Sequence, residues 1–236
     1  MKKPLIVAVI IAAILLTIIL VTQPRSTPPT GVEHLGIVYT LPTPLYDSET
    51  SIEKTLLARR SVRSYADEPL MLAELSQLLW AAQGITSPSG GRTAPSAGAL
   101  YPLEVYLLAG EVNDLPGGIY HYNPNDHTLT LVAGGDQRQA LYEAALSQSA
   151  VKDAAAVIVI TAIYERTTVK YSQRGIQYVH IEVGSVAQNV YLQAVALDLG
   201  TVFIGAFHDD QVREILQLGA EEQPLGLMPV GRKPVP

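Results

Sequence analysis

The 236-residue chain contains no cysteine, and this absence narrows its chemistry at once. Disulfides, thiolate nucleophiles, iron–sulfur clusters and cysteine-bound zinc are excluded. No G-x-G-x-x-G loop opens a βαβ unit and no P-loop occurs, so a Rossmann dinucleotide site is not expected. Basic residues are outnumbered, with 16 Lys and Arg against 22 Asp and Glu and a formal net charge of −6. Nucleic-acid binding usually needs a basic face and is not expected either.

An apolar run near the N-terminus predicts a membrane anchor. Leu5 to Val21 is apolar except for Thr17. A helix rising about 1.5 Å per residue over this run would span most of the roughly 30 Å hydrocarbon core of a bilayer. Lys2 and Lys3 precede the run, so the positive-inside rule predicts a cytoplasmic N-terminus and an extracytoplasmic domain. A cleaved signal peptide is the alternative, but no small-x-small cleavage pattern follows the run.

Composition divides the chain into a single-pass transmembrane anchor over 1–23, a Pro-rich linker over 24–48 and one domain over 49–236. The linker contains five prolines and no amphipathic period, which is typical of a tether. Within the domain, period-3.6 and period-2 patterns alternate. They predict helices over 48–60, 72–83, 136–146, 180–199 and 209–216, and strands over 103–109, 118–122, 128–132, 154–163, 201–205 and 225–230. The expected fold class is α+β.

Two short motifs indicate a ligand. Arg59-Arg60-Ser61-Val62-Arg63 places three guanidiniums and a hydroxyl within five residues, which is typical of an anion site. Ordinary surface charge that complements a helix dipole is the alternative. The stretch from Pro95 to Pro102 begins with small residues, so its backbone can lie close against a flat ligand. Together the two motifs indicate a phosphorylated planar cofactor.

Other interpretations fit less well. Ser96 lies in a sequence that approximates the nucleophile elbow of serine hydrolases, but no strand precedes it and the first glycine is missing. His121 and His127 could meet across a hairpin, but they lack a carboxylate motif, and no metal site is expected. Lys170 and Tyr171 could act as acid and base if burial moved their pKa values. From the residues alone, a solvated turn is the simpler interpretation for that pair.

In order and spacing, these motifs resemble those of the nitroreductase superfamily, specifically its SagB/ThcOx-like dehydrogenase branch. The resemblance covers about residues 50–233. It rests on the Arg59–Arg63 run, Thr93–Pro102, Lys170-Tyr171 with Arg174-Gly175, and Gly205-Ala206-Phe207. The family implies a nitroreductase-like α+β sandwich that binds FMN noncovalently, with flavin sites shared between the two chains of a homodimer.

The resemblance also implies site residues. FMN phosphate and ribityl oxygens would contact Arg59, Arg60, Ser61 and Arg63, with Arg232 as a further phosphate contact. Pro95, Ser96, Ala97 and Gly98 would border the flavin, largely from the partner chain, and Gly205 and Ala206 would lie beside its ring. Lys170 and Tyr171 match a Lys-Tyr pair with catalytic roles in azoline oxidases of this branch.

The expected function is that of an FMN-dependent oxidoreductase on a membrane-anchored homodimer. Substrate and electron acceptor would take turns in a ping-pong cycle of hydride or electron transfer, with a small organic or peptide-azoline substrate. NAD(P)H is a candidate electron donor. It is a cytoplasmic molecule, however, and the predicted topology places the domain on the other side of the membrane. The alternative is a non-catalytic, membrane-anchored flavin-binding or assembly protein.

Overall fold

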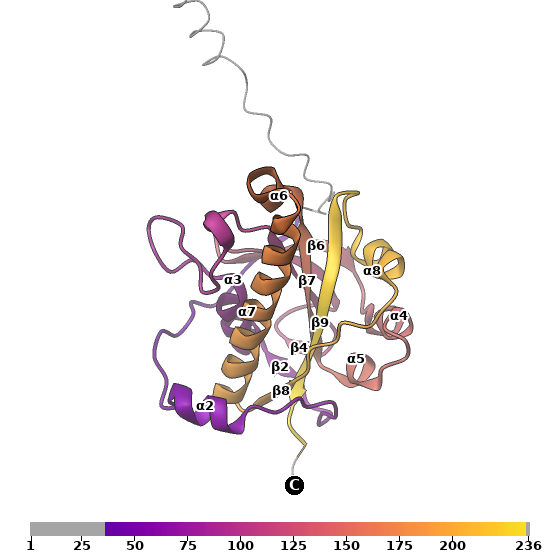
Figure 1. Ribbon diagram of the computed structural model, residues 1–236. Coiled ribbons are helices and arrows are strands. Elements are labelled where there is room, and N and C mark those ends of the chain that lie inside the picture. The colour runs from indigo at the N-terminus through magenta and orange to yellow at the C-terminus, as the bar shows by residue number, and fades with distance from the viewer. Residues whose placement is uncertain (1–35, 235–236) are drawn as a thin grey trace, which may run out of the picture. The chain divides into compact units, whose positions relative to one another are not determined.

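A seven-stranded antiparallel sheet in the order β1-β6-β5-β3-β7-β9-β8 organises residues 36–234, the part of the chain that the computed structural model describes (Figure 1). The elements are β1 (Val38–Thr40), α2 (Ile52–Ala58), β2 (Leu70–Met71), α3 (Leu72–Gln83), the 3-10 turn η1 (Ala97–Ala99), β3 (Leu103–Ala109), β4 (Val112–Asn113), β5 (Gly118–Asn123), β6 (Thr128–Gly134), α4 (Arg138–Ala144), α5 (Ser149–Asp153), β7 (Ala156–Ile163), α6 (Glu165–Tyr171), α7 (Arg174–Ala196), β8 (Leu199–Thr201), α8 (Asp209–Leu216) and β9 (Glu222–Arg232). β2 and β4 form a separate parallel pair.

Strand β7 is buried on both faces of the sheet. Ile158 and Ile160 belong to one hydrophobic core, whereas Val157 and Val159 belong to the other. This alternation is the period of two that a strand imposes on its side chains. β7 pairs antiparallel with β3 on one edge and with β9 on the other. The apolar run therefore forms the buried strand that was predicted, beginning at Ala156.

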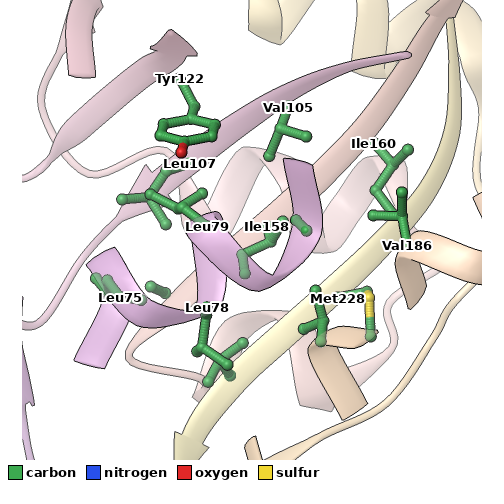
Figure 2. Close-up of a cluster of buried hydrophobic side chains, with 14 of the residues drawn as sticks. Leu75, Leu78, Leu79, Val105, Leu107, Tyr122, Ile158, Ile160, Val186 and Met228 are labelled. Carbon is green, nitrogen blue, oxygen red and sulfur yellow. The ribbon is translucent and has the colours of Figure 1, made fainter. Parts of the chain in front are cut away.

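Helices α3 and α7 cover one face of the sheet (Figure 1). The core beneath them, shown in Figure 2, contains Leu75, Leu78 and Leu79 of α3 and Val186 of α7, together with Val105, Leu107, Tyr122, Ile158, Ile160 and Met228 of the sheet. The bounds of α3 are those predicted from its apolar spacing, and the helix ends where Gly84 donates its N–H to the Trp80 carbonyl at 2.7 Å. This packing fixes the axis of α7 against the sheet.

The opposite face is covered by α4, α5 and α8. Leu141 of α4, Val151 of α5 and Val212 of α8 are buried there, against Tyr106 and Leu108 of β3. Helices therefore lie on both sides of one antiparallel sheet, and the predicted α+β class is confirmed. The described residues contain no helix long and apolar enough to cross a bilayer, and the anchor predicted over 1–23 lies outside them.

Several segments differ from expectation. Residues 38–40, predicted to belong to the linker, form β1 and pair with β6, while residues 24–35 lie outside the described part. α7 begins at Arg174 rather than at 180, because Gly175 and Val179 continue its buried face. β8 ends at Thr201 instead of starting there, and β9 extends beyond the predicted 225–230 at both ends.

Candidate functional site

The Arg59–Arg63 segment follows α2 and is attached to the edge of the sheet. Val62 donates its N–H to the Thr201 carbonyl of β8 at 2.9 Å. Val62 can lie this close to β8 only because residue 200 is a glycine: a Cβ at Gly200 would lie 2.6 Å from a methyl group of Val62. The segment is therefore held by its backbone, and its polar side chains are left to face outward.

The three arginines of this segment have no acidic partner. No carboxylate among the described residues forms an ion pair with Arg59, Arg60 or Arg63, although the protein is acidic overall. Arg60 donates to the carbonyls of Leu57 at 3.1 Å and Arg59 at 2.7 Å, so part of its charge stabilises the end of α2. Arg59 and Arg63 keep their guanidiniums available for an anion.

Tyr191 on α7 connects this segment to the residues that follow β8, and sequence reasoning did not find it. Its hydroxyl lies 3.2 Å from Ser61 Oγ and accepts the Phe203 N–H at 2.7 Å. The Arg59 guanidinium lies over the Tyr191 ring, 5.2 Å from its centre. One residue thus fixes both the hydroxyl and a cation of the motif, through contacts that span more than a hundred positions of sequence.

Beside Tyr191 lies a cavity of about 220 Å³, whose polar lining includes Arg60, Tyr191, Thr201 and Lys233 and no carboxylate. Thr201 Oγ1 is buried and has no hydrogen-bond partner. Two cations and two hydroxyls, one of which is buried and unpaired, form a donor set that suits a phosphate group. The residues present therefore fit the phosphate end of FMN.

A larger, open cavity of about 610 Å³ lies between α2, α3 and α7. Its walls include Trp80 and Tyr46, whose rings lie 5.5 Å apart, and the amides of Gln77, Asn189 and Gln193. No Lys or Arg lines it. Despite its size, this cavity lacks the charge that a phosphate would require, and it is not the anion site.

The small-residue turn over 95–98 lies against Lys170 and Tyr171. Gly98 has a φ of +65°, and a Cβ there would lie 2.7 Å from Tyr171 Oη and 2.9 Å from Lys170 Nζ. Lys170 and Tyr171 end helix α6 and do not form a turn, although Lys170 is exposed to solvent as that interpretation expected. Tyr171 also packs edge-on against Tyr178 of α7, with 5.1 Å between ring centres. An amine and a phenol therefore converge on the small-residue turn.

A buried carboxylate lies behind that turn. Glu182 of α7 is only 2% exposed, and its Oε1 has no hydrogen-bond partner. Burial raises the pKa of Glu182, while nearby Ser96, Gln83 and Arg92 act in the opposite direction. In the sequence this residue was only an isolated charge in an apolar helix; the fold places it next to Ser96 of the turn.

The remaining predicted residues lie elsewhere. Gly205 and Ala206 are exposed after β8, and the Ala206 carbonyl accepts a hydrogen bond from Gln148 Nε2 at 2.9 Å. Arg232 ends β9 and forms a two-point ion pair with Glu74 of α3, at 2.6 and 2.9 Å. Lys233, rather than Arg232, lines the small cavity, and its Nζ also pairs with the exposed Asp198 at 2.8 Å. Among the described residues no cluster of side chains could hold a metal ion.

The two halves of the candidate site lie at opposite ends of α7 (Figure 1). Lys170 and Tyr171 precede the start of the helix, whereas Tyr191 lies near its end, beside α2. At 1.5 Å per residue, Arg174 and Tyr191 are about 26 Å apart along the axis. Along one chain, the two halves of the candidate site are therefore separated by most of the length of α7.

Residues 56–232 match the nitroreductase family. The chain is 50% identical over 185 residues to a protein of Methanocaldococcus jannaschii named as a nitroreductase, MJ1384, and the match covers 78% of this chain and 92% of that protein. It is 31% identical over 142 residues to McbC, the microcin B17-processing protein of Escherichia coli. That match covers 56% of the chain and 52% of McbC, so the chain spans about half the length of this relative.

Solved structures agree with these sequence matches. A crystal structure described as a nitroreductase, from Ralstonia eutropha JMP134, has a TM-score of 0.74 and 30% identity, covering 91% of this chain and 96% of the other. A chain of the Escherichia coli microcin synthetase McbBCD complex, solved with truncated pro-MccB17 bound, has a TM-score of 0.66 and 26% identity. It covers 91% of this chain and 85% of that one.

Proposed function

The chain belongs to the nitroreductase family, and from that premise we propose that it is an FMN-dependent oxidoreductase of the SagB type that acts as a homodimer. One observation carries the proposal. An unpaired cationic segment with hydroxyl partners lies at one end of α7, and an amine–phenol pair on a small-residue turn lies at the other. The first half suits a phosphate and the second suits proton transfer beside a flat ring.

The chain's own residues have distinct roles in this proposal. Arg59, Arg63 and Ser61 bind the phosphate and ribityl oxygens, and Lys233 and the unpaired Thr201 hydroxyl add donors from the cavity wall. Arg60 contributes charge while it caps α2. Arg232 is the weakest candidate for a phosphate contact, because Glu74 already engages both of its terminal nitrogens.

Bound FMN would supply two-electron chemistry, accepting or giving up a hydride in turn with two substrates. Lys170 and Tyr171 would hold or move the accompanying proton at Nζ and Oη. Pro95, Ser96, Ala97 and Gly98 present little side-chain bulk, so they let the ring approach the backbone. Gly205 and Ala206 leave exposed backbone available to the same ring from the other chain.

A second copy would bring the two halves of the site together, because within one chain they are separated by most of the length of α7. A two-fold contact along α7 would run the two helices antiparallel, so that the start of one meets the end of the other. The outward side of α7 suits such a contact: Gln177, Ile181, Gly184 and Gln188 are exposed and uncharged, and nothing lies within 4 Å of the Cβ position of Gly184. Leu57 of α2, 78% exposed, adds apolar surface near the helix end.

The substrate class proposed is a small organic molecule or an azoline ring in a peptide. The support is the likeness to McbC, which is named as a microcin B17-processing protein, and to a chain of a synthetase complex solved with its peptide. We further propose that residues 1–23 anchor the chain in a membrane with its domain outside. Protease accessibility of intact cells tests that topology independently of the site.

The experiment that tests the proposed function uses the full chain purified in detergent. We expect a yellow protein with about one FMN per chain, a dimer by light scattering, and bleaching of the visible flavin band when a competent donor is added anaerobically. A colourless preparation that does not bind added FMN would overturn the proposal. Flavin that binds stoichiometrically but is never reduced by any donor would favour a non-catalytic flavin-binding protein instead.

A further inference from the structure

We infer that Tyr101 is a positioning residue: it holds the Pro95–Gly98 turn against Lys170 and Tyr171. The inference concerns the site of the proposed function and rests on that function for its catalytic consequence. The restraint of the turn by Tyr101 depends only on contacts within one chain and does not require the proposed function. Tyr101 is half-buried and belongs to neither hydrophobic core, so packing of the domain does not by itself explain how firmly it is held.

Tyr101 has an unfavourable backbone conformation. Its φ is +45°, and Ala99 and Gly98 have φ values of +54° and +65°. Only glycine adopts such left-handed angles without steric conflict between Cβ and the backbone. Two of these three residues carry a Cβ. Residues held in such angles persist only where the surroundings over-determine them, and they concentrate at functional sites.

Three contacts hold Tyr101, one on each of its parts. Its N–H donates to Ser96 Oγ at 2.9 Å, which closes the turn on itself. Its carbonyl accepts a hydrogen bond from Arg166 Nη1 at 3.2 Å. The Arg92 guanidinium lies over its ring, 4.4 Å from the ring centre. A cation at this distance from an aromatic face is attracted by the ring quadrupole.

The two arginines tie Tyr101 to different elements. Arg166 lies in α6 one turn before Lys170, and it pairs at 2.5 Å with Glu104 of β3, which in turn pairs with His121 of β5 at 2.9 Å. Arg92 donates to Gln83 Oε1 of α3 at 2.8 Å. Tyr101 therefore joins the turn to α6 and, through the arginines, to the sheet and α3.

This arrangement explains why the turn and the amine–phenol pair meet. Arg166 fixes α6, and hence Lys170, relative to the Tyr101 carbonyl, while Ser96 fixes the turn relative to the Tyr101 N–H. Loss of the ring removes the Arg92 contact and leaves only the two backbone hydrogen bonds to hold the left-handed angles against relaxation. The turn would move away from Lys170 and Tyr171 without unfolding the domain.

The test compares Tyr101→Ala with Tyr101→Phe in the full chain. Tyr101→Phe keeps the ring and should behave as wild type. Tyr101→Ala should speed amide hydrogen exchange in the peptide covering residues 95–101, and only there. In the flavin-loaded protein it should lower kcat by between about tenfold and a hundredfold at unchanged FMN occupancy. Tyr142→Ala is the control. Tyr142 lies on α4 and packs against the second core, and its ring also carries a cation, Lys152 Nζ at 5.8 Å; exchange over 95–101 should stay as in wild type.

Unchanged exchange over 95–101 in Tyr101→Ala would overturn the inference, and so would faster exchange spread equally over the whole domain. Arg166→Lys provides a second measurement, because it removes the forked donor and keeps the charge; the same local increase is expected. The exchange measurement needs no flavin. If wild type bound no FMN, the proposed function would fail while the restraint by Tyr101 could still be supported or rejected.

Discussion

Gly98 lies against Lys170, so that a Cβ built on the glycine would come within 2.9 Å of the ammonium nitrogen. Gly98→Ala should therefore displace Lys170 and strain the turn, whose φ at this position is +65°. We expect a loss of about 1 kcal/mol in stability from the left-handed backbone and a larger relative loss of turnover. Thermal midpoint and kcat, measured on the same preparations, check this expectation.

Gly90→Ala separates the two effects. Gly90 also has a positive φ, +84°, but nothing lies within 4 Å of its Cβ position. The Gly90→Ala variant should lose about as much stability as Gly98→Ala and keep full turnover. If the two variants lost turnover equally, the contact between Gly98 and Lys170 would have no functional meaning.

Arg59→Ala should weaken FMN binding. A charge-assisted hydrogen bond contributes about 1.5–3 kcal/mol, which corresponds to roughly 10- to 150-fold in the dissociation constant. Titration of the apoprotein with FMN, followed by flavin fluorescence, measures the dissociation constant. Lys54→Ala, which removes the same charge from α2 on the exposed side, is the control and should bind FMN normally. Equal affinities in Arg59→Ala and wild type would remove the phosphate role from Arg59.

Two carboxylates, buried Glu182 and half-buried Glu104, should give opposite pH dependences of stability. Burial raises the pKa of Glu182 above its ordinary 4.5, with Ser96, Gln83 and Arg92 opposing. Burial also acts to raise the pKa of Glu104, but His121 and Arg166 outweigh it and the pKa is lowered. The stability that protonated Glu182 contributes is full below its unfolded pKa and is lost as pH rises through the folded pKa. The stability that ionised Glu104 contributes is present above the unfolded pKa and is lost as pH falls through the folded value.

The apoprotein variants Glu182→Gln and Glu104→Gln report these signs. As pH rises above about 4.5, the thermal midpoint of Glu182→Gln should rise relative to wild type; as pH falls below about 4.5, wild type loses the stability of ionised Glu104 and the deficit of Glu104→Gln should shrink. Both substitutions keep the side-chain shape, so a difference in slope reflects charge. Curves parallel to wild type in both variants would show that neither pKa is shifted by folding.

Local patterns predicted much of the fold. The bounds of α3, β3 and α8 are those expected, because each is set by an apolar period together with a nearby turn or cap. The patterns missed α6 over Glu165–Tyr171, since a seven-residue helix with few apolar positions has little periodicity to detect. They also missed β1, whose pairing with β6 depends on a distant strand edge.

The site was predictable only in parts. The cationic run and the small-residue turn are contiguous in sequence, so their chemistry could be read directly. Tyr191, Arg166 and Arg92 could not be found, because their roles consist of contacts with residues far along the chain. A tyrosine within a long helix has the same local pattern whether it faces solvent, the core or Ser61.

Mixing two defective chains gives the sharpest test of a shared site. Suppose Arg59→Ala and Lys170→Ala each abolish turnover by themselves. In a heterodimer of the two, one site combines both substitutions, whereas the other takes Arg59 from the Lys170→Ala chain and Lys170 from the Arg59→Ala chain. That second site is intact if each site draws its two halves from different subunits. Random assembly makes half of the dimers mixed, so about a quarter of all sites should recover turnover after co-expression. If both halves came from the same chain, every site would carry one substitution and the mixture would stay inactive.

The double variant Arg59→Ala with Lys170→Ala, co-expressed with wild type, is the complementary control. In a mixed dimer each of its shared sites would carry one substitution, so only wild-type homodimers, again about a quarter, should be active under the shared arrangement. With sites confined to one chain, each mixed dimer would keep one intact site, and about half of all sites should be active. The two co-expressions thus predict different pairs of activities for the two arrangements.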